Sequence, residues 1–181
     1  MRPFPVLSAL LLLLAVPAVA DTPQKPLPHA AKAGGGPQPI GTFEDWTAAT
    51  NKEGGQTICY AFTRARASTP ALAGRGDVVL TVTERPAGRD AVAISAGFAF
   101  AANAAGRLTV DAAGFDLYTA QRSAFARDGH AAAVAMQRGR QAVAHLPGPK
   151  GAEVADTFSL KGFPQAYAAI VKRCPAGKPA A

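Results

Sequence analysis

Apolar and polar side chains alternate with a period of two along much of the chain between residues 57 and 160. This alternation is typical of β-strands that bury one face. It predicts strands over residues 57–63, 77–84, 91–100, 108–110, 115–118, 141–146 and 153–160. We expect one hairpin over 108–118, with Gly114 at a positive-φ position, and a second over 141–160.

Two stretches depart from this alternation and predict helices. Asp128 is a suitable N-cap for the alanine-rich run 130–138, and Gly139 is a suitable stop. Residues 163–174 carry apolar side chains with a helical period, beginning with Phe163 and ending with Cys174. We therefore expect a mostly β fold, an antiparallel β-sandwich or open barrel with a short helix and a C-terminal helix that packs on the sheet.

The first twenty residues have the three regions of a secretory signal peptide. Arg2 supplies the positive charge, an apolar stretch of about eleven residues follows, and the small-residue triplet ends at Ala20, so cleavage is expected between Ala20 and Asp21. The apolar stretch is shorter than the roughly 20 residues of a membrane-spanning helix. The sequence thus predicts a periplasmic or secreted protein without a transmembrane span, and this expectation extends to association with the outer membrane.

Composition divides the remainder into three parts. Residues 21–39 are rich in proline and glycine and predict a flexible leader, and residues 175–181 predict a disordered tail. The folded unit is expected over residues 40–174, which is one domain. A chain of 181 residues excludes a large multidomain enzyme.

The charge balance is basic, with a formal net charge of +7. The basic residues are scattered in pairs without interleaved aromatic residues, which favours a solvated surface. For an exported chain, the anionic partners expected are lipids, acidic glycans or acidic proteins rather than nucleic acids.

The two cysteines, Cys59 and Cys174, are predicted to form a disulfide, because the compartments that receive exported proteins oxidise paired thiols. The alternative is that Cys59 acts as a nucleophile with His130 or His145 as its base. No sequence motif surrounds either histidine, and no spacing of Cys or His residues indicates a metal site.

Other catalytic signatures are missing from the sequence, so we assign no catalytic residue and no cofactor. Asp156 shares the apolar face of a predicted strand, and we expect an Arg or a backbone amide to satisfy its carboxylate. The tripeptide Arg75-Gly76-Asp77 matches a short integrin-binding motif and is a tentative binding site. Its structural interpretation is a turn at Gly76, with Asp77 at the start of a strand.

The order of short motifs resembles the invasion-associated locus B family of exported bacterial proteins. The matching segments are residues 41–46, Cys59-Tyr60-Ala61, residues 75–78, Glu84-Arg85-Pro86, residues 156–163, Ala169-Ile170 and Cys174. The resemblance implies a small β-rich exported domain of Gram-negative bacteria, linked in pathogenic members to host-cell entry, and no established catalytic residue. Within it, Trp46 lies with Phe43 and Glu44 in a first strand and is expected to be the largest core side chain.

These observations predict a non-enzymatic envelope-associated domain that binds an envelope component or a host surface. The partner could be a protein or an anionic glycan or lipid, and the sequence leaves its identity and the oligomeric state open. The alternative is a small periplasmic hydrolase or isomerase without a recognisable motif.

Overall fold

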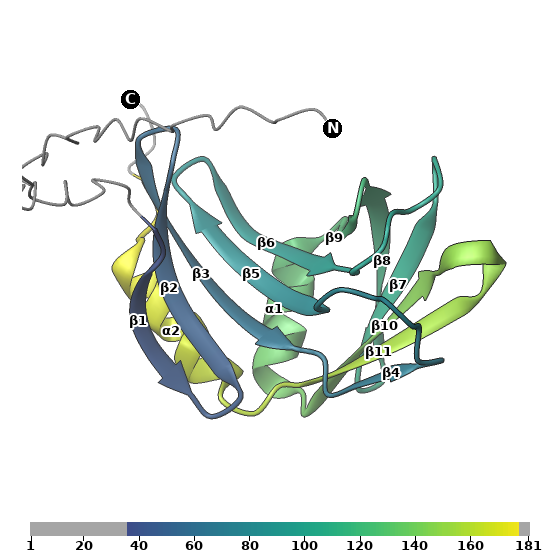
Figure 1. The fold of residues 1–181 in the computed structure, drawn as a ribbon. Helices are drawn as coiled ribbons and strands as arrows, with labels where there is room; N and C mark the ends of the chain where they lie inside the picture. The colour runs from purple at the N-terminus through teal and green to yellow at the C-terminus, as the bar shows by residue number, and fades with distance from the viewer. Residues whose placement is uncertain (1–35, 178–181) are drawn as a thin grey trace, which may run out of the picture. The chain divides into compact units, whose positions relative to one another are not determined.

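A computed structural model describes residues 36–177, which form one antiparallel sheet of eleven strands with two α-helices (Figure 1). The strands are β1 (Gln38–Phe43), β2 (Trp46–Glu53), β3 (Gln56–Arg64), β4 (Ala67–Thr69), β5 (Val79–Arg85), β6 (Gly88–Ser95), β7 (Ala105–Val110), β8 (Ala113–Ala120), β9 (Ser123–Ala126), β10 (Gln141–Pro147) and β11 (Glu153–Ser159). The helices are α1 (Gly129–Arg138) and α2 (Phe163–Arg173), and a short 3-10 turn covers Pro149–Gly151. The predicted fold class is confirmed.

The strand order is β1-β2-β3-β5-β6-β9-β8-β7-β10-β11-β4, with β1 and β4 at the two edges. The sheet is therefore curved but not closed into a barrel. The predicted hairpins over 108–118 and 141–160 are confirmed as β7–β8 and β10–β11. The predicted signal peptide with its cleavage site at Ala20 and Asp21, and most of the predicted leader and tail, lie outside the described residues.

Two local expectations differ from the structure. Asp111, with φ 48°, takes the positive-φ position that was expected for Gly114, because the β7–β8 turn is only two residues long and Asp tolerates the left-handed region. The strand expected over 91–100 ends at Ser95, where the chain turns at Gly97 with φ 75°. At Gly97 an added Cβ would lie 2.5 Å from the Gly76 carbonyl oxygen, so only glycine fits this close approach.

The N-terminal strand also differs from its prediction. Phe43 ends β1 and Trp46 begins β2, with Glu44 at φ 52° in the turn between them, so one expected strand is a hairpin. β1 begins at Gln38, two residues inside the range expected for the leader. Trp46 is fully buried as expected, and its indole N–H donates to the Ser159 carbonyl oxygen at 2.9 Å.

Both helices pack on the same face of the sheet, which we call the core face. α2 contacts β1, β2 and β3, and α1 contacts β6. On β3 this face carries the small side chains of Cys59, Ala61 and Thr63, because a helix packed closely over the strand leaves room only for small residues. The larger side chains of β3 point to the opposite face.

The helix boundaries follow from their caps. The Asp128 side chain accepts a hydrogen bond from the Ala131 N–H at 2.9 Å, and the Gly139 N–H closes α1 on the Ala135 carbonyl oxygen. Gly162, in the left-handed region at φ 87°, precedes α2 and passes against the Phe43 carbonyl. Both predicted helices are confirmed, and neither of these described helices is long and apolar enough to cross a membrane.

Candidate functional site

The structure places Asp156 at the centre of a buried ion pair. Its side chain is fully buried on the core face of β11, and each carboxylate oxygen accepts a hydrogen bond of 2.7 Å from the Arg75 guanidinium. The Ser68 hydroxyl donates to the same carboxylate at 2.7 Å. The prediction that an Arg satisfies Asp156 is confirmed, and the pair is bidentate, the strongest geometry for this contact.

The Arg75-Gly76-Asp77 tripeptide is divided between the interior and the surface. The Arg75 side chain is only 6% exposed, whereas the Asp77 side chain is 70% exposed and pairs with Arg64 at 3.0 Å. The Gly76 N–H donates to the Gly97 carbonyl oxygen at 3.4 Å. Arg75 therefore has a structural role in the fold, and the binding role of the tripeptide stays a prediction.

The predicted disulfide between Cys59 and Cys174 is present, with the two Cα atoms 5.8 Å apart. It joins the core face of β3 to the C-cap of α2 across 115 residues of sequence. With both sulfur atoms in the bond, Cys59 has no thiolate to act as the nucleophile of the alternative hypothesis.

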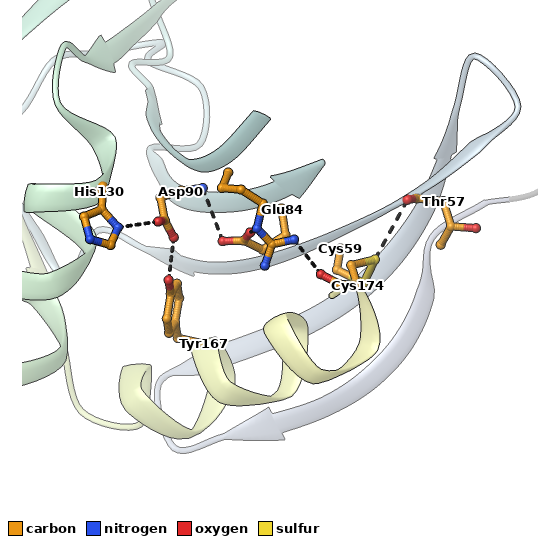
Figure 2. A network of polar contacts seen from close by, with 8 residues as sticks. Thr57, Cys59, Glu84, Asp90, His130, Tyr167 and Cys174 are labelled. Atoms are coloured by element: carbon orange, nitrogen blue, oxygen red, sulfur yellow. Dashed lines mark hydrogen bonds and ion pairs between the residues drawn. A yellow bond between two sulfur atoms is a disulfide. The ribbon is translucent and has the colours of Figure 1, made fainter. Parts of the chain in front are cut away.

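Next to the disulfide lies a polar network that was not predicted (Figure 2). Glu84 lies near the end of β5, and its side chain is fully buried on the core face. It forms an ion pair of 2.5 Å with Arg89. Asp90 accepts a hydrogen bond of 2.5 Å from the Tyr167 hydroxyl and contacts the His130 imidazole at 2.7 Å. The Asp90 N–H donates to Glu84 at 3.3 Å, which connects the two carboxylates.

The network ties three parts of the fold together. Glu84, Arg89 and Asp90 belong to the β5–β6 hairpin, His130 to α1 and Tyr167 to α2. Arg89 also donates to the carbonyl oxygen of Cys174, the C-cap residue of α2, at 2.6 Å. The network therefore fixes both helices to the sheet beside the disulfide.

A sequence signal for part of this network existed. Glu84 continues the core-facing series of Leu80 and Val82 along β5, so the alternation alone places a carboxylate in the core. Asp90, in contrast, follows a turn and adopts φ 54°, a conformation that no periodicity indicates.

The pKa values of the network residues shift in opposite directions. Burial raises the pKa of Glu84 to about 7, and the neighbouring Asp90 adds to the increase. Burial also opposes ionisation of Asp90, but hydrogen bonds from Tyr167 and His130 hold the pKa of Asp90 below its usual value. The hydrogen bond to Asp90 raises the pKa of His130.

These shifts predict a domain that is more stable in mild acid than in mild base. Groups with a raised pKa, here Glu84 and His130, stabilise the fold below their unfolded pKa, and this stabilisation is lost as the pH rises through the folded value. Asp90 acts in the opposite direction, but only below its usual pKa of about 4. From Glu84 alone, we expect the unfolding free energy to fall by about 1–3 kcal/mol between about pH 5 and about pH 8.

Urea denaturation across this pH range measures the effect. Glu84→Gln is expected to flatten most of the decrease, because an amide does not titrate. Glu53→Gln is the matched control, since Glu53 is an exposed carboxylate whose pKa Arg85 lowers. An unfolding free energy that rises from pH 5 to pH 8 would contradict the raised pKa of Glu84 in the folded protein.

The face of the sheet opposite the helices carries a band of uncharged side chains, and charged side chains such as Arg64, Arg107 and Asp116 lie toward the ends of this band. We call the following residues the outer face: Ile58, Tyr60, Phe62, Thr81, Thr83, Ala91, Ala93, Tyr118 and Phe125. The strand register aligns Phe62, Thr81, Ala93, Phe125 and Tyr118 in one row across β3, β5, β6, β9 and β8. In Figure 1, α2 lies behind β1 and β2 and α1 lies behind β5 and β6, so this face is turned toward the viewer there.

Aromatic pairs stand at both ends of this row. The Tyr60 and Phe62 ring centroids are 5.9 Å apart, and Tyr118 is stacked on Phe125 at 5.3 Å. The Arg127 guanidinium lies 5.6 Å from the centre of the Tyr118 ring. Tyr118 is 43% exposed and is the one exposed large hydrophobic side chain among residues 36–177.

A cleft of about 620 Å³ begins at Ala105, the cross-strand neighbour of Tyr118. It is lined by Ala105, Gly106, Arg107, Thr109, His145, Leu146, Pro147, Gly151, Ala152 and Glu153. Ala105 pairs directly with Tyr118 across β7 and β8, so the cleft continues the outer face. His145 contacts Glu153 at 3.3 Å and Arg107 contacts Asp116 at 3.1 Å at its rim.

The curved antiparallel sheet, the two helices on one face and the disulfide define a small disulfide-stabilised β domain. Residues 46–171 match the family described as Invasion associated locus B (IalB) protein. The chain belongs to the IalB family.

Structural comparison agrees with this family. The crystal structure of invasion associated protein B from Bartonella henselae is similar with a TM-score of 0.53 and 16% sequence identity, over 74% of this chain and 95% of that chain. At this identity the likeness concerns the fold. Comparison with curated protein sequences found no significant match.

Proposed function

We propose that this IalB-type chain is a non-enzymatic exported domain that binds another component of the cell envelope, or a host surface, through its outer face. The observation that carries the proposal is the outer face itself. It combines aromatic side chains with small neutral ones, and charged pairs such as Arg64–Asp77 and Arg85–Glu53 stand at its rim. A charge-depleted centre with aromatic residues and a polar rim is the anatomy of protein interfaces.

Two further observations support a location outside the cytoplasm. The Cys59–Cys174 disulfide is of a kind that persists in oxidising compartments. The sequence of residues 1–20 has the pattern of a signal peptide.

The structural neighbour is named as invasion associated, and a host surface is the corresponding partner for this chain in a pathogen.

Chemical crosslinking in intact cells, followed by separation of envelope fractions, tests the proposal. We expect a discrete crosslinked product in the envelope, and a strong decrease of that product with Phe62→Asp. Ala112→Asp adds the same charge on an exposed turn away from the outer face and is expected to retain the product. Mature protein found in the cytoplasm, or a product unaffected by Phe62→Asp, would contradict the proposal.

A further inference from the structure

Resting on the proposed function, we infer that the β8–β9 end of the outer face binds a protein partner with a carboxylate-bearing surface. Tyr118, Phe125 and Arg127 form the centre of this contact, and an apolar side chain of the partner enters the adjacent cleft. We call these three residues the Tyr118 cluster.

The first observation is the exposure of an ordered aromatic ring. Tyr118 is 43% exposed, yet Phe125 supports one side of its ring and the Arg127 guanidinium lies over it. Held in this way, Tyr118 loses little conformational entropy when a partner covers it. Tyr and Arg are also the residue types that contribute most to binding energy at interfaces.

The second observation is the charge around the cluster. Arg122 and Arg127, at the two ends of β9, form no ion pair with any acidic side chain in the described part of the chain. The Arg122 side chain donates to the Gly97 carbonyl oxygen instead. The nearest carboxylate on β8, Asp116, is paired with Arg107. This end of the outer face is therefore cationic, and complementarity requires carboxylates on the partner.

The third observation is the cleft next to the cluster. Its volume of about 620 Å³ falls within the range of pockets that hold side chains and small ligands. Leu146 and Pro147 give it apolar walls, while Arg107 and the paired His145 and Glu153 stand around it. An apolar anchor in such a cleft, flanked by aromatic and Arg contacts, is the usual centre of a protein interface.

The chemistry of the outer face favours a protein over a glycan or a lipid. Specific recognition of a sugar needs several convergent polar side chains. The outer-face residues themselves offer only hydroxyls, and the polar side chains at the cleft, Arg107, His145 and Glu153, already form ion pairs within the chain. Insertion into a bilayer needs several protruding apolar side chains, whereas Tyr118 is the one exposed large hydrophobic side chain among the described residues.

Site-specific photo-crosslinking in intact cells tests the inference. A photoreactive phenylalanine analogue replaces Tyr118 in the full chain, and adducts are analysed after protease, glycosidase and lipid extraction treatments. We expect one protease-sensitive adduct whose yield falls at least about tenfold with Arg127→Glu, as expected for the loss of a hot-spot contact. Arg127→Lys should retain most of it, and high salt should weaken it.

Arg140→Glu is the matched control. Arg140 is exposed immediately before β10, and its substitution by Glu reverses the same charge away from the cluster. Equal yields from Arg127→Glu and Arg140→Glu, or an adduct that only glycosidase or lipid extraction removes, would overturn the inference. If residue 118 gives no adduct while Phe62→Asp still abolishes chemical crosslinking, this inference fails and the proposed function stands. If both fail, the proposed function fails as well.

Discussion

Replacement of Asp156 by Ala is expected to lower the unfolding free energy by about 3–5 kcal/mol, because it leaves the buried guanidinium of Arg75 without its partner. Both side chains are almost completely removed from water, and the carboxylate accepts three hydrogen bonds. The loss should appear as a lower urea midpoint with an unchanged slope, since the same surface is exposed on unfolding.

Asp77→Ala is the control for this experiment. Asp77 lies two residues from Arg75 and also pairs with an Arg, but that pair is exposed and should contribute at most about 1 kcal/mol. Arg75→Ala should destabilise about as much as Asp156→Ala, and the double variant should lose less than the sum, because the two residues share one interaction. Additive losses would show that the buried pair does not act as a unit.

Removal of the disulfide is expected to cost about 2–5 kcal/mol. The bond closes a loop of more than a hundred residues and attaches the end of α2 to β3, so its loss both enlarges the unfolded ensemble and frees the end of the helix. Thermal melting with and without reductant measures the effect, and the intact mass of the oxidised protein should be two hydrogens below the reduced mass.

The control is the variant with both Cys59→Ser and Cys174→Ser. It should melt at the lower temperature of the reduced protein, and reductant should not change its melting temperature. Two free thiols in protein taken from its native compartment, or a melting temperature that reductant leaves unchanged in the native sequence, would contradict the stabilising role of the bond.

Local patterns predicted most elements of this fold because their causes lie within a few residues. The alternation along β5 and β11, the Asp128 cap of α1 and the helical period of α2 all survive in the structure. The alternation did not show which face of β3 is buried. The helices decide this, and they place the small face of Cys59 and Ala61 against themselves.

The candidate site was less accessible to sequence analysis because its parts are distant in sequence. The position of Asp156 on an apolar strand face indicated that its carboxylate needs a partner. That partner, Arg75, lies 81 residues away, and no local pattern connects the two residues. Tyr118 was predicted to lie in a strand, yet its exposure depends on the register of β8 with β7 and β9. The β7–β8 turn was also not determined by local sequence. Both Asp111 and Gly114 can occupy a positive-φ position in a hairpin, and the length of the loop decides which of them does so.

The central claim is that the outer face is covered by a partner, and tyrosine footprinting tests it directly. The chain has three tyrosines, of which Tyr60 and Tyr118 lie on the outer face. Tyr167 belongs to the polar network on the core face, where its hydroxyl donates to Asp90, and it serves as an internal control. We predict that a tyrosine-selective reagent modifies Tyr118, and to a smaller extent Tyr60, less in intact cells than in the purified protein, with Tyr167 unchanged. Equal modification of Tyr60 and Tyr118 in cells and in solution would contradict the account.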